Sequence, residues 1–326
     1  MTELIAEVGL AHEGSLGLAH SYIDSASSIG LDTVKFQMHI AEAESSSHEK
    51  FRINFSYEDK TRFEYWNRTS FTFEEWQKLI KHAESKNLNF LITPFSTTAL
   101  EDISKLGLKR IKLGSAEVID DLILNRALDY SFEYIISNGF CGDLIFETID
   151  LFKNRNKNLT VLECTSKYPC SNDDFNHVRF KSLFNKDIGV GVSDHSGDIS
   201  IPKYAISLGA DVIEAHIVFD KKMFGPDSSS SLEISQWAEI VKFRNDIKQI
   251  KNEKAYSLDT KMKKTFSRSL SFNKNLKKDH KISILDFESK KANGFGLPSC
   301  EFKNFIDKKL TKNVQKGDFV KISDFN

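Results

Sequence analysis

Residues 188–217 read IGVGVSDHSGDISIPKYAISLGADVIEAHI and contain two short β-branched runs on either side of a helical stretch. The runs IGVGVS (188–193) and DVIEAHI (211–217) have the length of buried strands. Between them, Ile199 to Leu208 has helical spacing that stops at Leu208-Gly209. A strand, a helix and a second strand in this order indicate two parallel strands joined by a crossover helix.

Six more runs of the same kind precede this unit, and helical patterns separate them. They are LIAEVG (4–9), DTVKFQ (32–37), NFLIT (89–93), KRIKLG (109–114), EYIIS (133–137) and LTVLEC (159–164). Eight strands that alternate with helices predict an α/β fold, a closed (β/α)₈ TIM barrel. An open doubly wound sheet is the alternative, but residues 9–15 read GLAHEGS where such a sheet often carries GxGxxG.

The chain of 326 residues is longer than one barrel of about 250 residues. A long helix is expected from Leu232 to about Ile250, so we predict a barrel domain at 1–255, a polar linker at 256–265 and a small β-rich domain at 266–326. In that last domain, the runs SRSLSF (267–272), ISIL (282–285) and FVKI (319–322) are strand-like. Two similar phrases there, NLKKDHKISILDF (275–287) and NVQKGDFVKISDFN (313–326), indicate an internal duplication.

Charge and composition exclude several classes of protein. The 45 basic and 46 acidic residues leave a net charge of −1, so nucleic acid is not expected as the main partner. No apolar run approaches the length of a membrane span, and MTELIAEVGL (1–10) lacks the basic region of a signal peptide. The four cysteines have no CxxC spacing, which favours reduced thiols in the cytoplasm.

One connection is unusually long. Residues 40–71 follow the second predicted strand and therefore belong to the face where barrel active sites lie. A connection of this length is either a functional lid or disordered. Its aromatic residues favour a packed lid: Phe51, Phe55, Tyr57, Phe63, Tyr65 and Trp66.

Polar side chains gather at the carboxyl ends of all eight predicted strands. They are Glu7, Lys35, Gln37, His39, Thr93, Lys112, Ser115, Glu117, Ser137, Glu163, Ser166, Ser193, Asp194, His195, Glu214 and His216. In a closed barrel these ends open onto one face, so residues distant in sequence are expected to meet at one mouth.

His195 and His216 follow adjacent strands, which lie about 4.8 Å apart. Both imidazoles could then reach one ion, and two neutral nitrogens suit Mn²⁺, Fe²⁺, Co²⁺ or Zn²⁺. Glu7, Asp194 and Glu214 are candidates for further ligands or for orienting the rings. A structural role for each histidine is the alternative.

Lys35 and Lys112 lie inside apolar strands, where an ammonium group is costly to bury unless it meets an anion. With nearby hydroxyl groups they resemble a cradle for phosphate or carboxylate. The hydroxyl donors are Ser115, Ser137 and Ser193. Pairing of the lysines with Glu7 or Glu117 is one alternative, and a Schiff-base lysine is another.

GPD (225–227) follows the last strand. Asp227 could accept a hydrogen bond from a substrate hydroxyl. A turn that caps the next helix through Ser230 or Ser231 is the alternative.

Several of these stretches together resemble the sialic acid synthase (NeuB) family in order and spacing. They are AEVGLAHEGS (6–15), TVKFQ (33–37), TPFS (93–96), KLGSAEV (112–118), CTSKYP (164–169), GVSDHSG (191–197), IEAHIVFD (213–220) and GPDSSSSL (225–232). The last 60 or so residues are similar to that family's C-terminal antifreeze-like (SAF) domain.

The resemblance implies condensation of phosphoenolpyruvate (PEP) with a 2-acetamido sugar, either N-acetylmannosamine or a related 6-deoxy di-N-acetylated hexose. The product would be a nine-carbon 2-keto-3-deoxy acid, with release of phosphate. It also implies a divalent metal on His195 and His216, Mn²⁺ first, with Mg²⁺ or Co²⁺ as alternatives.

The resemblance further implies roles for the strand-end residues. Glu7 and Glu117 are expected to be catalytic, together with Lys35 and Lys112. The expected PEP contacts also include Thr93, Ser115, Ser137 and Ser193. Ser166, which stands where some relatives have asparagine, is a further expected substrate contact. The expected sugar contacts are Gln37, Tyr168 and Asp227. The family's tail reaches the sugar site of a partner chain, which implies a domain-swapped homodimer.

The sequence departs from the family pattern at Ala11, at Ala215 and in KKANGFGLP (290–298), where Lys291 or Ala292 stands at the place of a tail arginine. Two other functions therefore stay open. One is a Schiff-base aldolase or lyase that uses Lys112. The other is a sugar-acid binding protein without catalysis.

Overall fold

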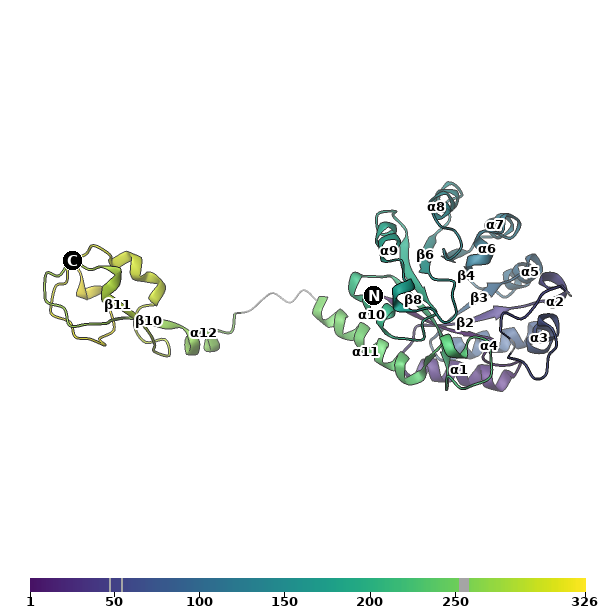
Figure 1. Ribbon diagram of the computed structural model, residues 1–326, viewed down its shortest axis with the longest axis horizontal. Coiled ribbons are helices and arrows are strands. Elements are labelled where there is room, and N and C mark those ends of the chain that lie inside the picture. The colour runs from purple at the N-terminus through teal and green to yellow at the C-terminus, as the bar shows by residue number, and fades with distance from the viewer. Residues whose placement is uncertain (47, 54, 252–257) are drawn as a thin grey trace. The chain divides into compact units, whose positions relative to one another are not determined.

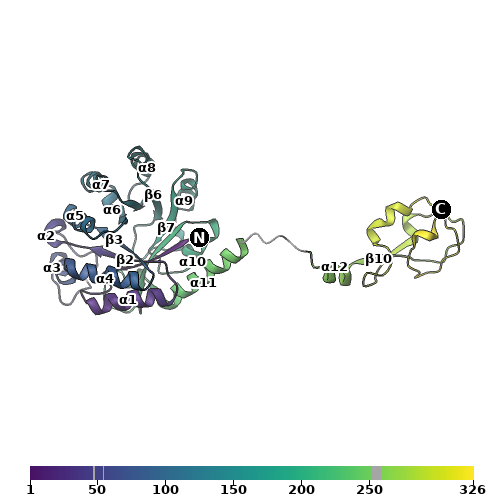
Figure 2. The same ribbon diagram turned by 180° about the vertical axis from the view of Figure 1, so that it is seen from behind.

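The computed structural model describes residues 1–46, 48–53, 55–251 and 258–326. The chain divides into two compact units, Met1–Asn252 and Glu253–Asn326, each with its own hydrophobic core (Figures 1 and 2). The predicted end of the first domain at residue 255 and the start of the linker at 256 lie outside the described residues.

The first unit contains eight parallel strands in the order β3-β2-β1-β8-β7-β6-β5-β4, and β3 lies beside β4, so the strands form a closed ring. The strands are β1 (Glu3–Gly9), β2 (Thr33–Met38), β3 (Asn89–Pro94), β4 (Arg110–Leu113), β5 (Glu133–Ser137), β6 (Leu159–Cys164), β7 (Gly189–Asp194) and β8 (Val212–Val218). A two-residue strand, β9 (Leu232–Glu233), pairs with β8. The predicted (β/α)₈ barrel is confirmed.

Helices surround the ring of strands, as Figures 1 and 2 show. They are α1 (Leu16–Ser28), α2 (Ala41–Glu44), α3 (Arg62–Thr69), α4 (Phe73–Ser85), α5 (Thr97–Lys105), α6 (Ser115–Val118), α7 (Asp121–Leu128), α8 (Leu144–Asn154), α9 (His177–Leu183), α10 (Ser200–Leu208) and α11 (Ile234–Lys251). Short 3₁₀ turns cover Asn172–Asp174 and Ser228–Ser230. Side-chain caps such as Ser15, Thr72 and Ser96 begin α1, α4 and α5 by accepting a backbone N–H.

The interior of the barrel changes from apolar to polar along the strands. An apolar layer contains Ile5, Leu91, Ile135, Leu162 and Val212. Because strand side chains alternate, the residues two positions further along face the same interior. These residues are Glu7, Thr93, Ser137, Cys164 and Glu214, and all five are buried. The apolar layer thus forms a floor beneath a polar mouth.

The segment 40–71, which we call the lid segment, is packed as predicted, apart from residues 47 and 54, which lie outside the described part. It contains α2 and α3. Its apolar side chains form a cluster with Leu10, which follows β1: Ala41, Tyr65 and Trp66 are buried, and Phe51, Phe55 and Phe63 pack around them. In this segment, Thr61 and Glu64 form a capping box that begins α3.

The second unit has one antiparallel pair, β10 (Arg268–Phe272) with β11 (Phe287–Lys291). The strands predicted at 282–285 and 319–322 are wrong, because these runs lead into the 3₁₀ turns Ile284–Asp286 and Ile322–Asp324. Asp286 and Asp324 hold these turns by accepting backbone N–H groups at 2.8 and 2.9 Å. A further 3₁₀ stretch covers Ser299–Phe305.

The duplicated phrases of the second unit pair with each other. Asn275 accepts the backbone N–H of Lys316, and Asn313 accepts that of Lys278, both at 2.8 Å. Leu276 and Val314 form a β-bridge between them. The two phrases therefore occupy equivalent places around one small core.

The predicted linker is partly helical, because α12 (Thr260–Phe266) covers its second half and ends one residue beyond it. Asp259 begins this helix by accepting the N–H of Met262 at 2.9 Å. Lys263 and Lys264 stand in its last turn, where cations stabilise a helix. In the part of the chain that the structure describes, no helix is long and apolar enough to cross a membrane.

Candidate active site

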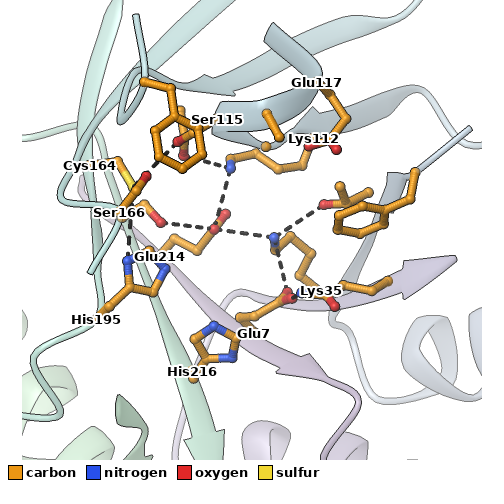
Figure 3. A pocket seen from close by; sticks show the side chains of 18 of the residues that line it. Glu7, Lys35, Lys112, Ser115, Glu117, Cys164, Ser166, His195, Glu214 and His216 are labelled. Atoms are coloured by element: carbon orange, nitrogen blue, oxygen red, sulfur yellow. Dashed lines mark hydrogen bonds and ion pairs between the residues drawn. The ribbon is translucent and has the colours of Figure 1, made fainter. Parts of the chain in front are cut away.

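A cavity of about 650 Å³ lies at the carboxyl ends of the strands, and we call it the inner cavity (Figure 3). All eight strands contribute to its wall. Of the residues predicted for the site, it lacks His39, Glu163, Asp194 and Asp227 and brings together Glu7, Lys35, Gln37, Thr93, Lys112, Ser115, Glu117, Ser137, Ser166, Tyr168, Ser193, His195 and His216. Glu214, Cys164, Phe95 and Phe140 also line it.

Lys35 is buried between two carboxylates. Its Nζ lies 3.1 Å from Glu7 Oε2 and 3.2 Å from Glu214 Oε1. It also donates to Thr93 Oγ1 at 3.2 Å. Burial opposes the charged form, but Glu214 and Glu7 outweigh it and raise the pKa of Lys35. The sequence left open a pairing of this lysine with Glu7, and the structure shows that pairing.

Lys112 shares Glu214 with Lys35, as the dashed lines of Figure 3 show. Its Nζ donates to Ser137 Oγ at 2.7 Å and lies 3.5 Å from Glu214 Oε1. Burial lowers the pKa of Lys112, and Glu214 opposes that effect. For Glu214 itself, burial is outweighed by Lys112 and Lys35, which lower its pKa to about 2.

Glu117 does not pair with either lysine among the described residues, so the pairing with Glu117 that the sequence left open is not found. Its side chain is buried at the edge of the cavity, beside Gly114. Burial raises the pKa of Glu117. Lys35 and Lys112 are thus balanced by Glu7 and Glu214, and Glu117 is a separate carboxyl group.

Hydroxyl groups from three consecutive strands converge on one side of the inner cavity. Ser115 accepts the backbone N–H of Gly139 at 3.0 Å, and a side chain at residue 139 would collide with the hydroxyls of Ser115 and Ser166. Glycine therefore leaves room between these hydroxyls. Ser193 completes the group from the other side by donating to Glu214 at 3.2 Å.

The two histidines come from the ends of adjacent strands, with ring centroids 5.6 Å apart and ring planes tilted by 46°. His195 Nδ1 lies 3.1 Å from the carbonyl oxygen of Thr165, so in the neutral ring this nitrogen donates and Nε2 keeps a free lone pair. His216 is the register partner of Glu7. In the described ranges, no group of three or more His, Cys, Asp or Glu side chains is arranged to hold a metal ion.

Two residues of the predicted mouth point elsewhere. Glu163 binds Arg179 at 2.6 Å and Asn138 at 2.8 Å, and Asp194 accepts from Ser196 at 2.7 Å. Neither lines the inner cavity. Both directly neighbour an inward-facing residue on their strand, and strand alternation turns them toward the helices. Asp194 is therefore not beside the two histidines as a further ligand.

A second hollow, with about 800 Å³ of empty space, lies between the lid segment and the barrel mouth, and we call it the outer cavity. Gln37, Phe95, Tyr168 and His216 line both cavities, so they border each other. Its other lining residues are Leu10, His39, Phe51, Arg52, Ile53, Phe55, Arg62, Tyr65, Trp66, Pro226 and Asp227. Six of the side chains that line the outer cavity are Phe, Tyr or Trp, whereas the inner cavity is lined by several charged side chains.

Sequence reasoning missed two residues of this region. Arg52 donates to Asp227 Oδ1 at 2.7 Å, and no local pattern could have paired residues so far apart in the chain. Cys164 lies 3.9 Å from His195 Nδ1 and lines the inner cavity. Strand alternation places it two positions after Leu162 of the apolar layer, so this signal could have found it.

Comparison with known proteins agrees with this geometry. Residues 22–256 match the sequence model of the NeuB family. The chain belongs to the NeuB family. It is 31% identical to N,N'-diacetyllegionaminic acid synthase of Campylobacter jejuni, over 98% of this chain and 99% of that protein.

Two further similarities cover the barrel. Human N-acetylneuraminate-9-phosphate synthase is 31% identical over 73% of this chain and 68% of that protein. The crystal structure of N-acetylneuraminic acid (sialic acid) synthetase from Leptospira borgpetersenii in complex with citrate is 28% identical, with a TM-score of 0.69. That match covers 80% of this chain and 89% of the other.

Proposed function

We propose that this NeuB-family chain condenses PEP with a 2-acetamido sugar and releases phosphate. The product would be a nine-carbon 2-keto-3-deoxy acid, as the names of its relatives suggest. The observation that carries the proposal is the inner cavity, where Lys35 of β2 and Lys112 of β4 are both buried and share the carboxylate of Glu214. A cavity of this kind suits a small polyanion, and the bordering outer cavity suits a sugar.

PEP would bind in the inner cavity through Lys35 and Lys112, with Thr93 and the hydroxyl groups as further donors. These hydroxyl groups belong to Ser115, Ser137, Ser166 and Ser193. The acceptor would lie across the border between the cavities, near Gln37 and Tyr168. Its aldehyde carbon would then face C3 of PEP.

A divalent cation fits the residues between the two substrates. Lys35 and Lys112 are already balanced by Glu7 and Glu214, so a substrate with several negative charges calls for more positive charge. His195 and His216 would hold the cation, Mn²⁺ first, with Mg²⁺ or Co²⁺ as alternatives, because His195 Nε2 keeps its lone pair for the cavity. When bound, the cation would polarise the sugar aldehyde as a Lewis acid.

The bonds change in two stages. The π electrons of the C2–C3 double bond of PEP form a bond from C3 to the aldehyde carbon, the π pair of the aldehyde moves to its oxygen, which takes up a proton, and positive charge develops at C2. Water then adds at C2 and loses a proton, and the new hydroxyl loses its remaining proton to become the 2-keto group as the C2–O bond breaks and phosphate departs with the electron pair. Glu7 and Glu117 are the buried carboxyl groups that could move the protons of these steps.

The second unit carries a separate proposal. Its duplicated phrases around one core support an SAF domain at residues 266–326. We propose that it serves a second copy of the chain in a domain-swapped homodimer. Sedimentation should then show a dimer, and a monomer at micromolar concentration would contradict this.

The burial that lowers the pKa of Lys112 favours one second candidate, an aldolase that forms a Schiff base. The test is an acceptor screen with PEP and Mn²⁺, using N-acetylmannosamine and di-N-acetylated 6-deoxy sugars. The proposed synthase releases phosphate only with an acceptor and loses activity in EDTA. A Schiff-base enzyme instead retains activity in EDTA, and borohydride traps its substrate on Lys112.

A further inference from the structure

Arg52 connects three segments that are distant in the sequence. It comes from the lid segment, and its guanidinium donates to Asp227 Oδ1 at 2.7 Å and to the carbonyl oxygen of Pro226 at 3.1 Å. The same guanidinium lies 4.3 Å from the ring centroid of Tyr168. The loops after β6 and β8 are thus tied to the lid segment through one side chain.

The two partners of Arg52 border the place where the substrates would meet. Tyr168 lines both cavities, and its ring lies 4.1 Å from the ring of His195. Asp227 lines the outer cavity. Among the described residues, the Asp227 carboxylate has no hydrogen-bond partner other than Arg52. Arg52 therefore fixes the direction in which this carboxylate points.

Stability alone does not account for this arrangement. The side chain of Arg52 is 39% exposed and that of Asp227 is 25% exposed. Exposed ion pairs contribute little to the free energy of folding. A planar guanidinium that holds a carboxylate and lies on an aromatic ring gives geometric precision instead.

The cations around the outer cavity already have anionic partners. Arg52 pairs with Asp227, and Arg62 lies 3.1 Å from Glu49. A phosphate group on the acceptor would have to compete with these carboxylates. Six of the fifteen lining residues are Phe, Tyr or Trp, and such rings suit the apolar faces and acetyl methyl groups of an uncharged sugar.

We propose that Arg52 is a positioning residue that sets acceptor specificity. It holds Asp227 and Tyr168 in position to contact the acceptor. Because the charge of Arg52 is itself paired with Asp227, the outer cavity is selective for an uncharged acylamino sugar. This inference rests on the proposed synthase function, since it concerns the second substrate of that reaction.

The first test compares Arg52→Gln and Arg52→Lys with the wild type in steady-state kinetics, varying acceptor and PEP separately. Arg52→Gln should lower kcat/KM for the acceptor about ten- to thirtyfold, the range of a lost charge-assisted hydrogen bond, with KM for PEP within about twofold. For Arg52→Lys, kcat/KM for the acceptor should lie between the values of Arg52→Gln and the wild type, because lysine keeps the positive charge but lacks the planar guanidinium group. An unchanged acceptor kcat/KM, or an equal rise in KM for PEP, would overturn the inference.

Lys50→Gln is the matched control, because it removes one exposed lid charge outside both cavities. It should behave as the wild type. Thermal unfolding of each variant checks that the fold is intact, and a midpoint close to that of the wild type is expected because Arg52 is partly exposed.

The second test compares N-acetylmannosamine with its 6-phosphate. The wild type should prefer the uncharged sugar at least about tenfold in kcat/KM. Asp227→Asn should lower the ratio of kcat/KM for N-acetylmannosamine to kcat/KM for its 6-phosphate, because it leaves the Arg52 guanidinium free to bind the phosphate group. A wild type that prefers the 6-phosphate overturns the inference. A wild type that turns over neither these two sugars nor a di-N-acetylated 6-deoxy hexose contradicts the proposed function instead, and calorimetric binding of the two sugars then decides the preference.

Discussion

The inner and outer cavities border each other but are built in different ways. The inner cavity takes its charged groups from strands, and Lys35, Lys112 and Glu214 are at most 4% exposed. The outer cavity takes Phe51 and Arg52 from the lid segment, and six of its fifteen lining residues are Phe, Tyr or Trp. Backbone pairing between strands fixes the first set, whereas side-chain packing and the contacts of Arg52 with Asp227 and Pro226 hold the second. The difference indicates that the part of the reaction common to the family lies inside, and the choice of acceptor outside.

The largest effect is expected from the inner lysines. Lys112→Met removes a donor from PEP but leaves Glu214 paired with Lys35, so the fold should survive. We expect kcat/KM for PEP to fall about 10³-fold, the upper range for loss of one electrostatic contact in a buried site. Steady-state assays of phosphate release at varied PEP concentration measure this fall in kcat/KM.

Lys109→Met is the control, because that lysine is exposed just before the opposite end of the same strand. It should leave the kinetics of PEP unchanged. If kcat/KM for PEP in Lys112→Met stays within tenfold of the wild-type value, the inner cavity is not the PEP-binding part of the site and the distinction between the two cavities is contradicted.

A smaller effect is expected at Glu117. Burial raises its pKa above the ordinary value of 4.5, so the ionised form is lost earlier as the pH falls. If Glu117 accepts a proton in the reaction, the acid limb of kcat/KM lies above pH 4.5. Glu117→Gln should lower kcat about 10²-fold and remove that limb. The measurement is a pH profile of both enzymes, with the exposed Glu101→Gln as the control; the same limb in Glu117→Gln would assign it to another group.

The smallest effect is expected in the outer cavity. Phe51→Ala removes an edge-to-face contact with Phe55, whose ring centroid lies 5.3 Å away, and opens the aromatic wall. KM for the acceptor should rise about five- to tenfold, which is the scale of one aromatic contact, while KM for PEP stays constant. Tyr57→Ala in the same segment is the control, because Tyr57 is 93% exposed. Equal changes in both KM values would show that the cavities are not separate.

The barrel could be predicted from the sequence because each buried strand is a short β-branched run between helical patterns. The eight predicted strands agree with the observed ones to within one residue at each end. The second unit was harder to predict. Ile284 and Ile322 have the composition of strands, but the aspartates that follow form turns by accepting backbone N–H groups. Local side-chain bonds there override the propensity of the run.

For the site, strand position was the useful signal. It placed Lys35, Lys112 and both histidines at one mouth, but it did not distinguish inward from outward residues, so Glu163 was included wrongly. Glu214 was expected only as a further ligand or as an orienting carboxylate, and it lies between the two lysines. The contact between Arg52 and Asp227 depends on how the lid segment packs, which no local pattern determines.

The most direct measurement is phosphate release from PEP by the wild-type protein with and without an acceptor. If the inner cavity binds PEP and the outer cavity binds the sugar, phosphate appears only when both are present, in equal amount to the nine-carbon acid. Phosphate release at the same rate without any sugar, or no release with any acetamido sugar, would contradict this division of the site.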